Sequence, residues 1–454
     1  MRQINQQPVW KALFFFVVPL MLSNMLQSTG TTVSSMLLGR MVSLEALAAV
    51  SAFFPVLFTL IAFIIGVGSG SSVLIGQAYG AKNYPQLRII MGTTLTFTFA
   101  LGVLMAILGG TFTREVLLLI KTPVNIIDDS MIYGRITFAA LPVLFLYAVY
   151  TTFLRGTGDS KTPFYFLIFS TILSLLLTPA LILGWAGLPA LGVGGAAYAS
   201  VLSSLTAFIV LLAYLVGVDH PLKFDRAMLK HLRIDGRILK LLLKIGVPTS
   251  IQMIFISLSE IALLALVNTY GSSATAAYGA VNQVISYVEM PAVSLGIAVS
   301  VFGAQAIGAG EPDRLRAILR AGVFLSYAVG GLLITLTYLS GRTVLGWFLT
   351  DPATLEMSYR LLVINLWADL IFGNLTVLSG LMRASGNVFW PTALSILSIW
   401  GVLIPVAYYL SPRLGIDGIW LAYPVQFAAG LLLQFCYYYF FWRNRQHKML
   451  LAQK

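Results

Sequence analysis

Three carboxylic acids lie inside long apolar segments, and they are the side chains of this sequence best suited to chemistry. They are Glu260, Glu289 and Asp369. At a rise of about 1.5 Å per helical residue, each lies about 20 Å along its segment from the end that adjoins the basic loops. An ionised side chain at the centre of a bilayer costs about 2.5–3.5 kcal/mol. Each acid therefore needs to face the bundle interior or water, with a cation, a proton or a hydrogen-bond donor as its partner.

No lysine or arginine lies at that depth, so a mobile cation or a proton is the expected partner. Na+ is a hard cation suited to oxygen ligands, and nearby hydroxyls and amides could complete its shell. These neutral candidates are Ser257, Ser259, Asn365 and Asn374. Two carboxylates close together at low dielectric would instead favour proton uptake. We expect a cation-coupling site of Glu260, Asp369, Glu289 and Asn365, in which Glu260 and Asp369 bind Na+, with H+ as the alternative ion.

A purely structural role is the alternative for these acids. In their protonated form they would bridge neighbouring helices through hydrogen bonds. This interpretation applies best to Glu289, because Pro291 leaves a helical carbonyl without its usual donor.

The segments that carry the acids belong to a chain with the composition of an integral membrane protein. Of its 454 residues, 58% are hydrophobic and 10% are charged, against roughly 25% charged in soluble domains. About 20 helical residues cross a bilayer core, and the apolar runs reach that length without the alternation of barrel strands. We predict an all-α integral membrane protein with twelve transmembrane helices. The predicted spans are 12–37, 47–75, 89–111, 131–154, 163–185, 192–217, 242–269, 275–302, 317–340, 357–381, 391–411 and 415–441.

The second half of the chain repeats the first at a constant offset. The matched pairs include Arg155 with Arg383, Gly158 with Gly386, Gly68 with Gly296, Gln77 with Gln305 and Arg88 with Arg316. With six spans in each copy, both copies have the same orientation, which predicts two six-helix lobes related by a pseudo-twofold axis along the membrane normal. We expect an N-terminal lobe over 1–218, a cytoplasmic amphipathic linker over 219–241 and a C-terminal lobe over 242–454. The linker is expected to form an amphipathic helix that lies on the inner membrane surface. A plain polar tether is the alternative for the linker.

Most of the 28 lysines and arginines fall in loops on one side of the predicted spans. The positive-inside rule therefore places both termini in the cytoplasm. The same rule accounts for the net charge of +12, so we expect no nucleic-acid partner.

The residue inventory argues against an enzyme. Cys436 is the only cysteine, and the three histidines all fall in polar segments. Neither an intramolecular disulfide nor a cysteine or histidine metal cluster is expected. No nucleophile arrangement appears inside the spans, so we predict a protein that is not an enzyme and has no cofactor besides a coupling ion.

Several segments resemble the MATE family of multidrug and toxin extrusion transporters over nearly the whole chain. They include VPLMLSNMLQSTGTTVSSMLLGR, GSGSSVLIGQAYGAKN, LRGTGDSKTP and their counterparts in the second half. The Gly-Gln-x-x-Gly-Ala pattern from Gly76 to Ala81 is the most specific of these. The resemblance implies a V-shaped pair of lobes in the bacterial inner membrane that exports organic cations against Na+ or H+ by alternating access. A single chain with two lobes is sufficient as a functional monomer.

Within the family, the chain is similar to the NorM-type branch, whose cation site is formed by acids in spans seven and ten. Glu260 and Asp369 match those places. Many members also carry an aspartate in span one, where Ser34 stands in this sequence. An N-lobe cation switch is therefore not expected.

Aromatic, methionine and amide side chains suit small cationic amphiphilic substrates, through dispersion and cation–π contacts. The candidates for a substrate cleft are Phe53, Phe54, Tyr278, Asn282, Gln283, Tyr287 and Met290. For any single one of Phe53, Phe54, Tyr278, Tyr287 and Met290, core packing is the favoured explanation. A lipid-linked oligosaccharide flippase of the same superfamily is the alternative function, but it would need basic residues at mid-depth to hold a pyrophosphate.

Overall fold

The computed structural model describes residues 8–187 and 189–451, and its regular elements are all helical there. The first half contains six long helices and three short ones. They are α1 (Val9–Met41), α2 (Leu44–Gly80), α3 (Tyr84–Thr111), α4 (Thr113–Leu119), α5 (Ile127–Gly156), α6 (Lys161–Leu183), η1 (Trp185–Gly187), α7 (Val193–Gly217) and α8 (Arg226–Leu229).

The second half repeats six spans, four of which are interrupted or change helix type. The elements are α9 (Gly236–Asn268), α10 (Ser272–Gly308), α11 (Arg314–Leu325), η2 (Ser326–Gly330), α12 (Gly331–Gly346), α13 (Pro352–Leu366), α14 (Asp369–Ala384), α15 (Phe389–Ser398), η3 (Ile399–Leu403), α16 (Ile404–Leu414), α17 (Ile416–Tyr437) and η4 (Tyr438–Trp442). The segments η2, η3 and η4 are π-helical. Periodicity in the sequence gives no sign of them.

Eleven helices of the described residues are long and apolar enough to cross a membrane, and the bent pair α13 and α14 makes a twelfth. The predicted all-α membrane protein with twelve spans is confirmed. The termini, which we predict to be cytoplasmic, lie outside the described residues.

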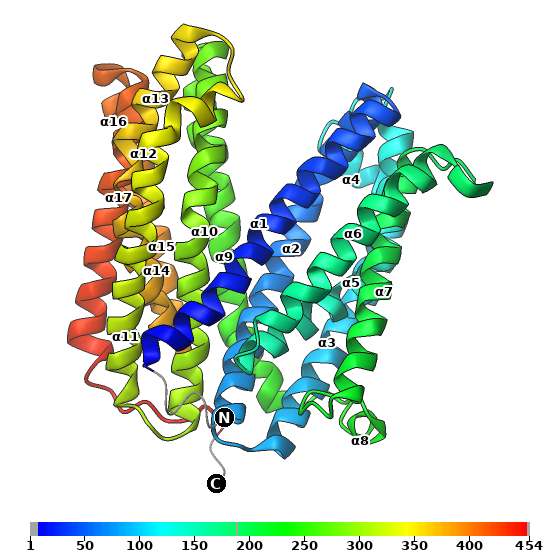
Figure 1. The fold of residues 1–454 in the computed structure, drawn as a ribbon, viewed down its shortest axis with the longest axis vertical. Coiled ribbons are helices and arrows are strands. Elements are labelled where there is room, and N and C mark those ends of the chain that lie inside the picture. The colour runs from blue at the N-terminus through cyan, green and yellow to red at the C-terminus, as the bar shows by residue number, and fades with distance from the viewer. Residues whose placement is uncertain (1–7, 188, 452–454) are drawn as a thin grey trace. The chain divides into compact units, whose positions relative to one another are not determined.

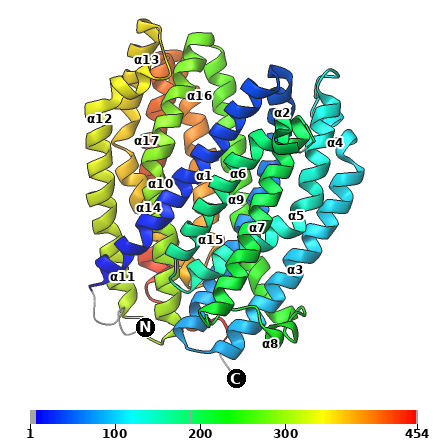
Figure 2. The ribbon, with the colours of Figure 1, turned by 45° about the vertical axis from the view of Figure 1, so that its right-hand side comes forward.

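The helices drawn in Figures 1 and 2 group into two compact units. The N-terminal unit comprises residues 22–79 and 83–246, and in it α6 and α7 lie side by side. Among the described residues, the C-terminal unit comprises 8–21, 80–82 and 247–451. The grouping differs from the expected lobes in three places. Residues 9–21 of α1 and residues 80–82 belong to the C-terminal unit, and the start of α9, up to Gly246, belongs to the N-terminal unit.

Close helix contacts explain why glycines are matched between the two copies. In the C-terminal unit, α10 and α14 are packed so closely that a Cβ on Gly380 would overlap the carbonyl oxygen of Gly296. In the N-terminal unit, a Cβ on Gly68 would lie 2.9 Å from a methyl carbon of Thr152. Small residues let helix backbones approach closely in membranes, so the matched glycines mark the same helix contact in both units.

The linker between the two halves is not one continuous amphipathic helix. Two aspartates start separate helices within it. Asp225 accepts a hydrogen bond from the Met228 N–H at 2.9 Å and begins the four-residue α8. Asp235 accepts from the N–H groups of Arg237 and Ile238 and begins α9. Side-chain caps of this kind define helix starts.

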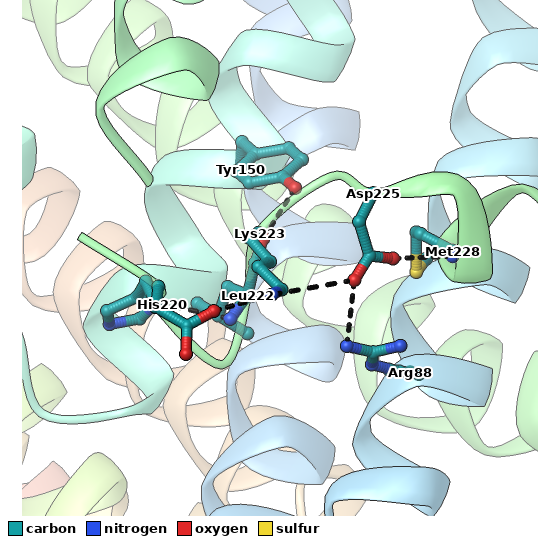
Figure 3. A network of polar contacts seen from close by, with 8 residues as sticks. Arg88, Tyr150, His220, Leu222, Lys223, Asp225 and Met228 are labelled. Atoms are coloured by element: carbon teal, nitrogen blue, oxygen red, sulfur yellow. Dashed lines mark hydrogen bonds and ion pairs between the residues drawn. The ribbon is translucent and has the colours of Figure 1, made fainter. Parts of the chain in front are cut away.

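Asp225 also ties the linker to α3 (Figure 3). Its carboxylate lies 3.1 Å from the guanidinium of Arg88 and 3.9 Å from the ammonium of Lys223. The Met228 N–H, followed by Arg88 and Lys223, lowers the pKa of Asp225 below its ordinary value. A lowered carboxyl pKa contributes stability above the unfolded value of about 3.9, which is lost as the pH falls through the folded value.

We predict that Gly380→Ala destabilises the C-terminal unit, because the added methyl group forces α10 and α14 apart. Overpacking of this kind costs about 1–3 kcal/mol, and thermal unfolding in detergent measures it as a lower Tm. Gly331→Ala is the matched control, since a Cβ there meets nothing within 4 Å and alanine favours a helix. Equal losses in both variants would contradict the close contact.

Candidate cation site

The three acids expected from the sequence all belong to the C-terminal unit. Glu260 lies on α9, Glu289 on α10, and Asp369 is the first residue of α14. Glu289 is within electrostatic range of Glu260, and Asp369 is within range of Glu289. Glu289 is therefore within range of both other acids, each of which comes from a different span.

A break in span ten positions Asp369. The helices α13 and α14 meet at an angle of 43° across Trp367 and Ala368. The Asn365 carbonyl accepts from the Ala368 N–H at 2.8 Å, and the carbonyl of Val363 accepts from the Tyr338 hydroxyl at 3.1 Å. Helix α14 therefore begins anew at Asp369, and the positive end of its dipole favours a negative charge there.

Four buried oxygen atoms around this break receive no hydrogen bond from the described residues. They are the side-chain Oδ1 of Asn365, both carboxylate oxygens of Asp369 and Oδ1 of Asn374. The three side chains are 2%, 5% and 8% exposed, respectively. The Asn374 amide donates its Nδ2 to the Leu370 carbonyl at 2.9 Å, which leaves its oxygen free. A buried acceptor without a partner costs about 1–3 kcal/mol, so this group of oxygens is suited to a cation or a proton.

The donor set favours an alkali cation or a proton over a transition metal. In the part of the chain that the structure describes, no three His, Cys, Asp or Glu side chains form a metal-binding group. Ligands other than the acids would thus be amide, hydroxyl or carbonyl oxygens, which hard cations prefer. Ser259 lies beside Glu260 in sequence, but its hydroxyl donates to the Ile256 carbonyl of its own helix at 2.7 Å.

The two glutamates are more accessible than Asp369. Glu260 is exposed at the surface of the C-terminal unit, and Glu289 is half-buried. Neither carboxyl group is hydrogen-bonded or paired with a basic side chain within the described residues. The alternative in which Glu289 bonds a carbonyl freed by Pro291 is therefore not seen in this structure.

An aromatic cluster on α17 adjoins the acids, and sequence analysis missed it. The hydroxyls of Tyr423 and Tyr278 lie 3.0 Å apart, and both rings contact Trp420. Tyr423 is within electrostatic range of Glu260 and Glu289. The polar residues around Pro424 in an otherwise apolar span were the signal that could have identified it.

The expected cleft residues divide between core and surface. Phe53 is fully buried against Phe138 and Tyr133, so the prediction that it lines a cleft is not supported by its packing. Tyr278 is 4% exposed and belongs to the core of the C-terminal unit. The remaining candidates of this unit are all half-buried on α10, and they are Asn282, Gln283, Tyr287 and Met290.

Phe54 lines a separate cavity of about 330 Å³ within the N-terminal unit. Its other lining residues are Thr31, Thr32, Ser35, Met36 and Leu47. Thr31 and Thr32 correspond through the repeat to Glu260, and both hydroxyls donate to the Ser28 carbonyl. The lining contains no charged side chain, so the N-terminal unit has a neutral cavity where the C-terminal unit has an acid.

We predict that Asp369→Asn raises the Tm in buffer free of Na+ at alkaline pH, where the Asp369 carboxyl is ionised. There the substitution removes a buried charge that has no partner, and such a charge destabilises a fold. Asp351→Asn is the matched control, because Asp351 accepts hydrogen bonds from both the N–H and the hydroxyl of Thr354; its Tm should be unchanged or lower. A lower Tm for Asp369→Asn would contradict the lack of a partner.

One family model, MatE, matches the chain twice, at residues 19–180 and 248–409. The double match confirms the internal repeat. The probable multidrug resistance protein YoeA of Bacillus subtilis (strain 168) is 55% identical over 97% of this chain and 96% of its own length. The FAD transporter of Shewanella oneidensis is 30% identical over 87% of this chain and 86% of its own.

The fold agrees with that of solved transporters. The outward-facing structure of a multidrug resistance MATE family transporter of the MOP superfamily superposes with a TM-score of 0.86, at 20% identity and with 96% of each chain covered. At that identity the likeness concerns the fold. With the family model matching most of the sequence, this chain belongs to the MatE family, whose members are membrane transporters and not enzymes.

Proposed function

We propose that this chain is a secondary antiporter that exports hydrophobic organic cations in exchange for Na+. The observation that carries the proposal is the group of buried, unpaired oxygens of Asn365, Asp369 and Asn374 at the break in span ten. A cation bound there would supply the missing partner. Glu289 and Glu260 extend the negative charge from this buried end toward the surface of the unit.

The competition between two cations for these acids provides the coupling. A bound Na+ neutralises the carboxylates, and a cationic substrate near Glu260 does the same, so each weakens the binding of the other. Such reciprocal coupling is a thermodynamic requirement of linked sites. The multidrug names of relatives, such as YoeA and the Staphylococcus MepA proteins, support a broad range of substrates.

Flavin export is the second candidate function. The Shewanella FAD transporter is 30% identical to this chain, against 22% for MepA of Staphylococcus aureus. An anionic flavin nucleotide would need basic side chains near the acids, and the spans of the C-terminal unit have lysine and arginine only toward their ends. The same reasoning disfavours the flippase alternative.

Membrane placement follows from the charge distribution. We place the chain in a bacterial plasma membrane with both termini in the cytoplasm, because the basic loops fall on that side. The two lobes alternate access to the acids as a monomer, and the linker joins them.

We predict that Glu260→Gln and Asp369→Asn each abolish Na+-driven export of a cationic dye from proteoliposomes, while the amount of inserted protein is unchanged. Each amide keeps the size of the side chain and removes one of the negative charges for which Na+ and the cationic substrate compete. Glu356→Gln is the control, because Glu356 is exposed and, in the part of the chain that is described, pairs with Arg342 alone, at 3.1 Å; it should transport normally. Normal transport by both site variants would contradict a role of Glu260 and Asp369 in ion coupling.

The coupling ion is tested by imposing a Na+ gradient and a pH gradient separately. We expect the Na+ gradient to drive transport. We also expect Na+ to raise the Tm of the wild type, because an ion at one hundred times its Kd adds about 2.7 kcal/mol to the free energy of unfolding. Asp369→Asn should lose this stabilisation. Transport driven by the pH gradient alone would replace Na+ with H+, and FAD transport without dye transport would favour the second candidate.

A further inference from the structure

The repeat places an arginine at the start of a span in each unit, with different surroundings. In the N-terminal unit, Arg88 on α3 pairs at 3.1 Å with Asp225, which comes from the segment after the sixth span (Figure 3). Its counterpart Arg316, on α11, forms no ion pair within the described residues and is exposed. The segment after the twelfth span supplies further basic side chains in place of an acid.

These basic side chains surround a cavity of about 670 Å³ in the C-terminal unit. It lies between the start of α11 and the chain that follows η4. Among the residues that the structure describes, its charged lining comprises Arg316, Arg443, Arg445 and Lys448, with Asp313 as the one acid. Tyr438, Trp442 and His447 add aromatic walls. The lining therefore holds a clear excess of positive charge.

The tail that forms one wall of this cavity is anchored to the unit. The Trp442 Nε1 donates to the Ser385 hydroxyl at 2.9 Å, and the His447 ring stacks on the Trp442 ring with centroids 3.9 Å apart. Leu450 packs over Gly386 at the end of α14. The Nε2 atom of His447 is buried and receives no partner from the described residues. The wall is thus a packed structure with unused hydrogen-bonding capacity.

We propose that this cavity binds a phosphate group, supplied by an anionic phospholipid headgroup or by free phosphate. The bound anion takes the place that the Asp225 carboxylate occupies beside Arg88 in the other unit. Arginine binds phosphate oxygens through paired N–H donors, and several basic groups around one anion share its charge. Binding would hold the tail against α11.

Topology alone does not account for this arrangement. The positive-inside rule requires basic residues in these loops, but it does not require them to line one cavity. Arg314 lies two residues before Arg316, pairs with Glu311 at 2.9 Å, and is not among the cavity-lining residues. Two arginines of the same helical turn thus differ within the described residues: Arg314 is paired with a carboxylate of the protein, and Arg316 is not.

The test is calorimetric titration of the delipidated full-length protein in neutral detergent. The probes are short-chain phosphatidylglycerol, short-chain phosphatidylcholine and inorganic phosphate. We expect saturable binding of phosphatidylglycerol or of phosphate, and none of phosphatidylcholine. Arg316→Gln should weaken this binding about tenfold, the loss of a charged hydrogen bond, whereas Arg314→Gln, which removes an equal charge, should leave it nearly unchanged.

A second variant supplies the anion internally. Gln446→Glu places a carboxylate in the cavity lining, as Asp225 does in the other unit, and should abolish binding of both phosphate probes while the protein remains folded. If Arg316→Gln does not fold, Lys448→Gln serves in its place. Binding of phosphatidylglycerol without phosphate identifies a lipid headgroup, and binding of both with equal strength identifies a free phosphate. The absence of saturable binding, or equal losses in the variants of Arg314 and Arg316, overturns the proposal.

Discussion

A polar group inside a membrane has no bulk water to bond, and its partner must come from the protein or from a bound ion. This constraint explains why every span that the structure describes is helical. Close packing of small residues brings the helices together at glycines such as Gly296 and Gly380. The same constraint explains how the break in span ten is tolerated. The Tyr338 hydroxyl bonds the Val363 carbonyl just before that break. What the protein leaves unpaired is the carboxylate of Asp369 with two neighbouring amide oxygens.

The two copies of the repeat differ in the polar groups that they place inside the membrane. Asp369 corresponds to Leu141, which lies within the continuous helix α5, and the corresponding span of the second copy is broken. Glu260 corresponds to the region of Thr31 and Thr32, whose hydroxyls are satisfied by their own helix. The N-terminal unit is thus neutral where the C-terminal unit carries acids. The π-helical segments found in the second half add to this difference, and such segments are frequent at functional sites.

The two units also differ in how they balance the positive charge of their basic side chains near Arg88 and Arg316. Asp225 balances Arg88 within the N-terminal unit, whereas Arg316 and the tail after η4 leave positive charge unbalanced around a cavity. The first copy has an apolar or neutral residue in place of the buried acids and an internal carboxylate beside its arginine, whereas the described part of the second copy leaves charged or polar groups without a partner in both places. The C-terminal unit therefore has a candidate cation site at mid-span and a candidate anion site at its end.

The sequence alone determined the membrane class, the twelve spans, the repeat and the candidate acids, because hydropathy, charge and spacing are local properties of the chain. It did not determine that the linker would break into capped turns, since the caps of Asp225 and Asp235 compete with a continuous amphipathic pattern. Phe53 looked like a cleft residue, yet its ring is buried against Phe138. Only the tertiary structure placed Tyr423 within electrostatic range of Glu260 and Glu289 and left the side-chain oxygens of Asn365, Asp369 and Asn374 buried without donors among the described residues. Those features depend on a 43° bend and on side chains from separate spans meeting in space, and neither is encoded in any single segment.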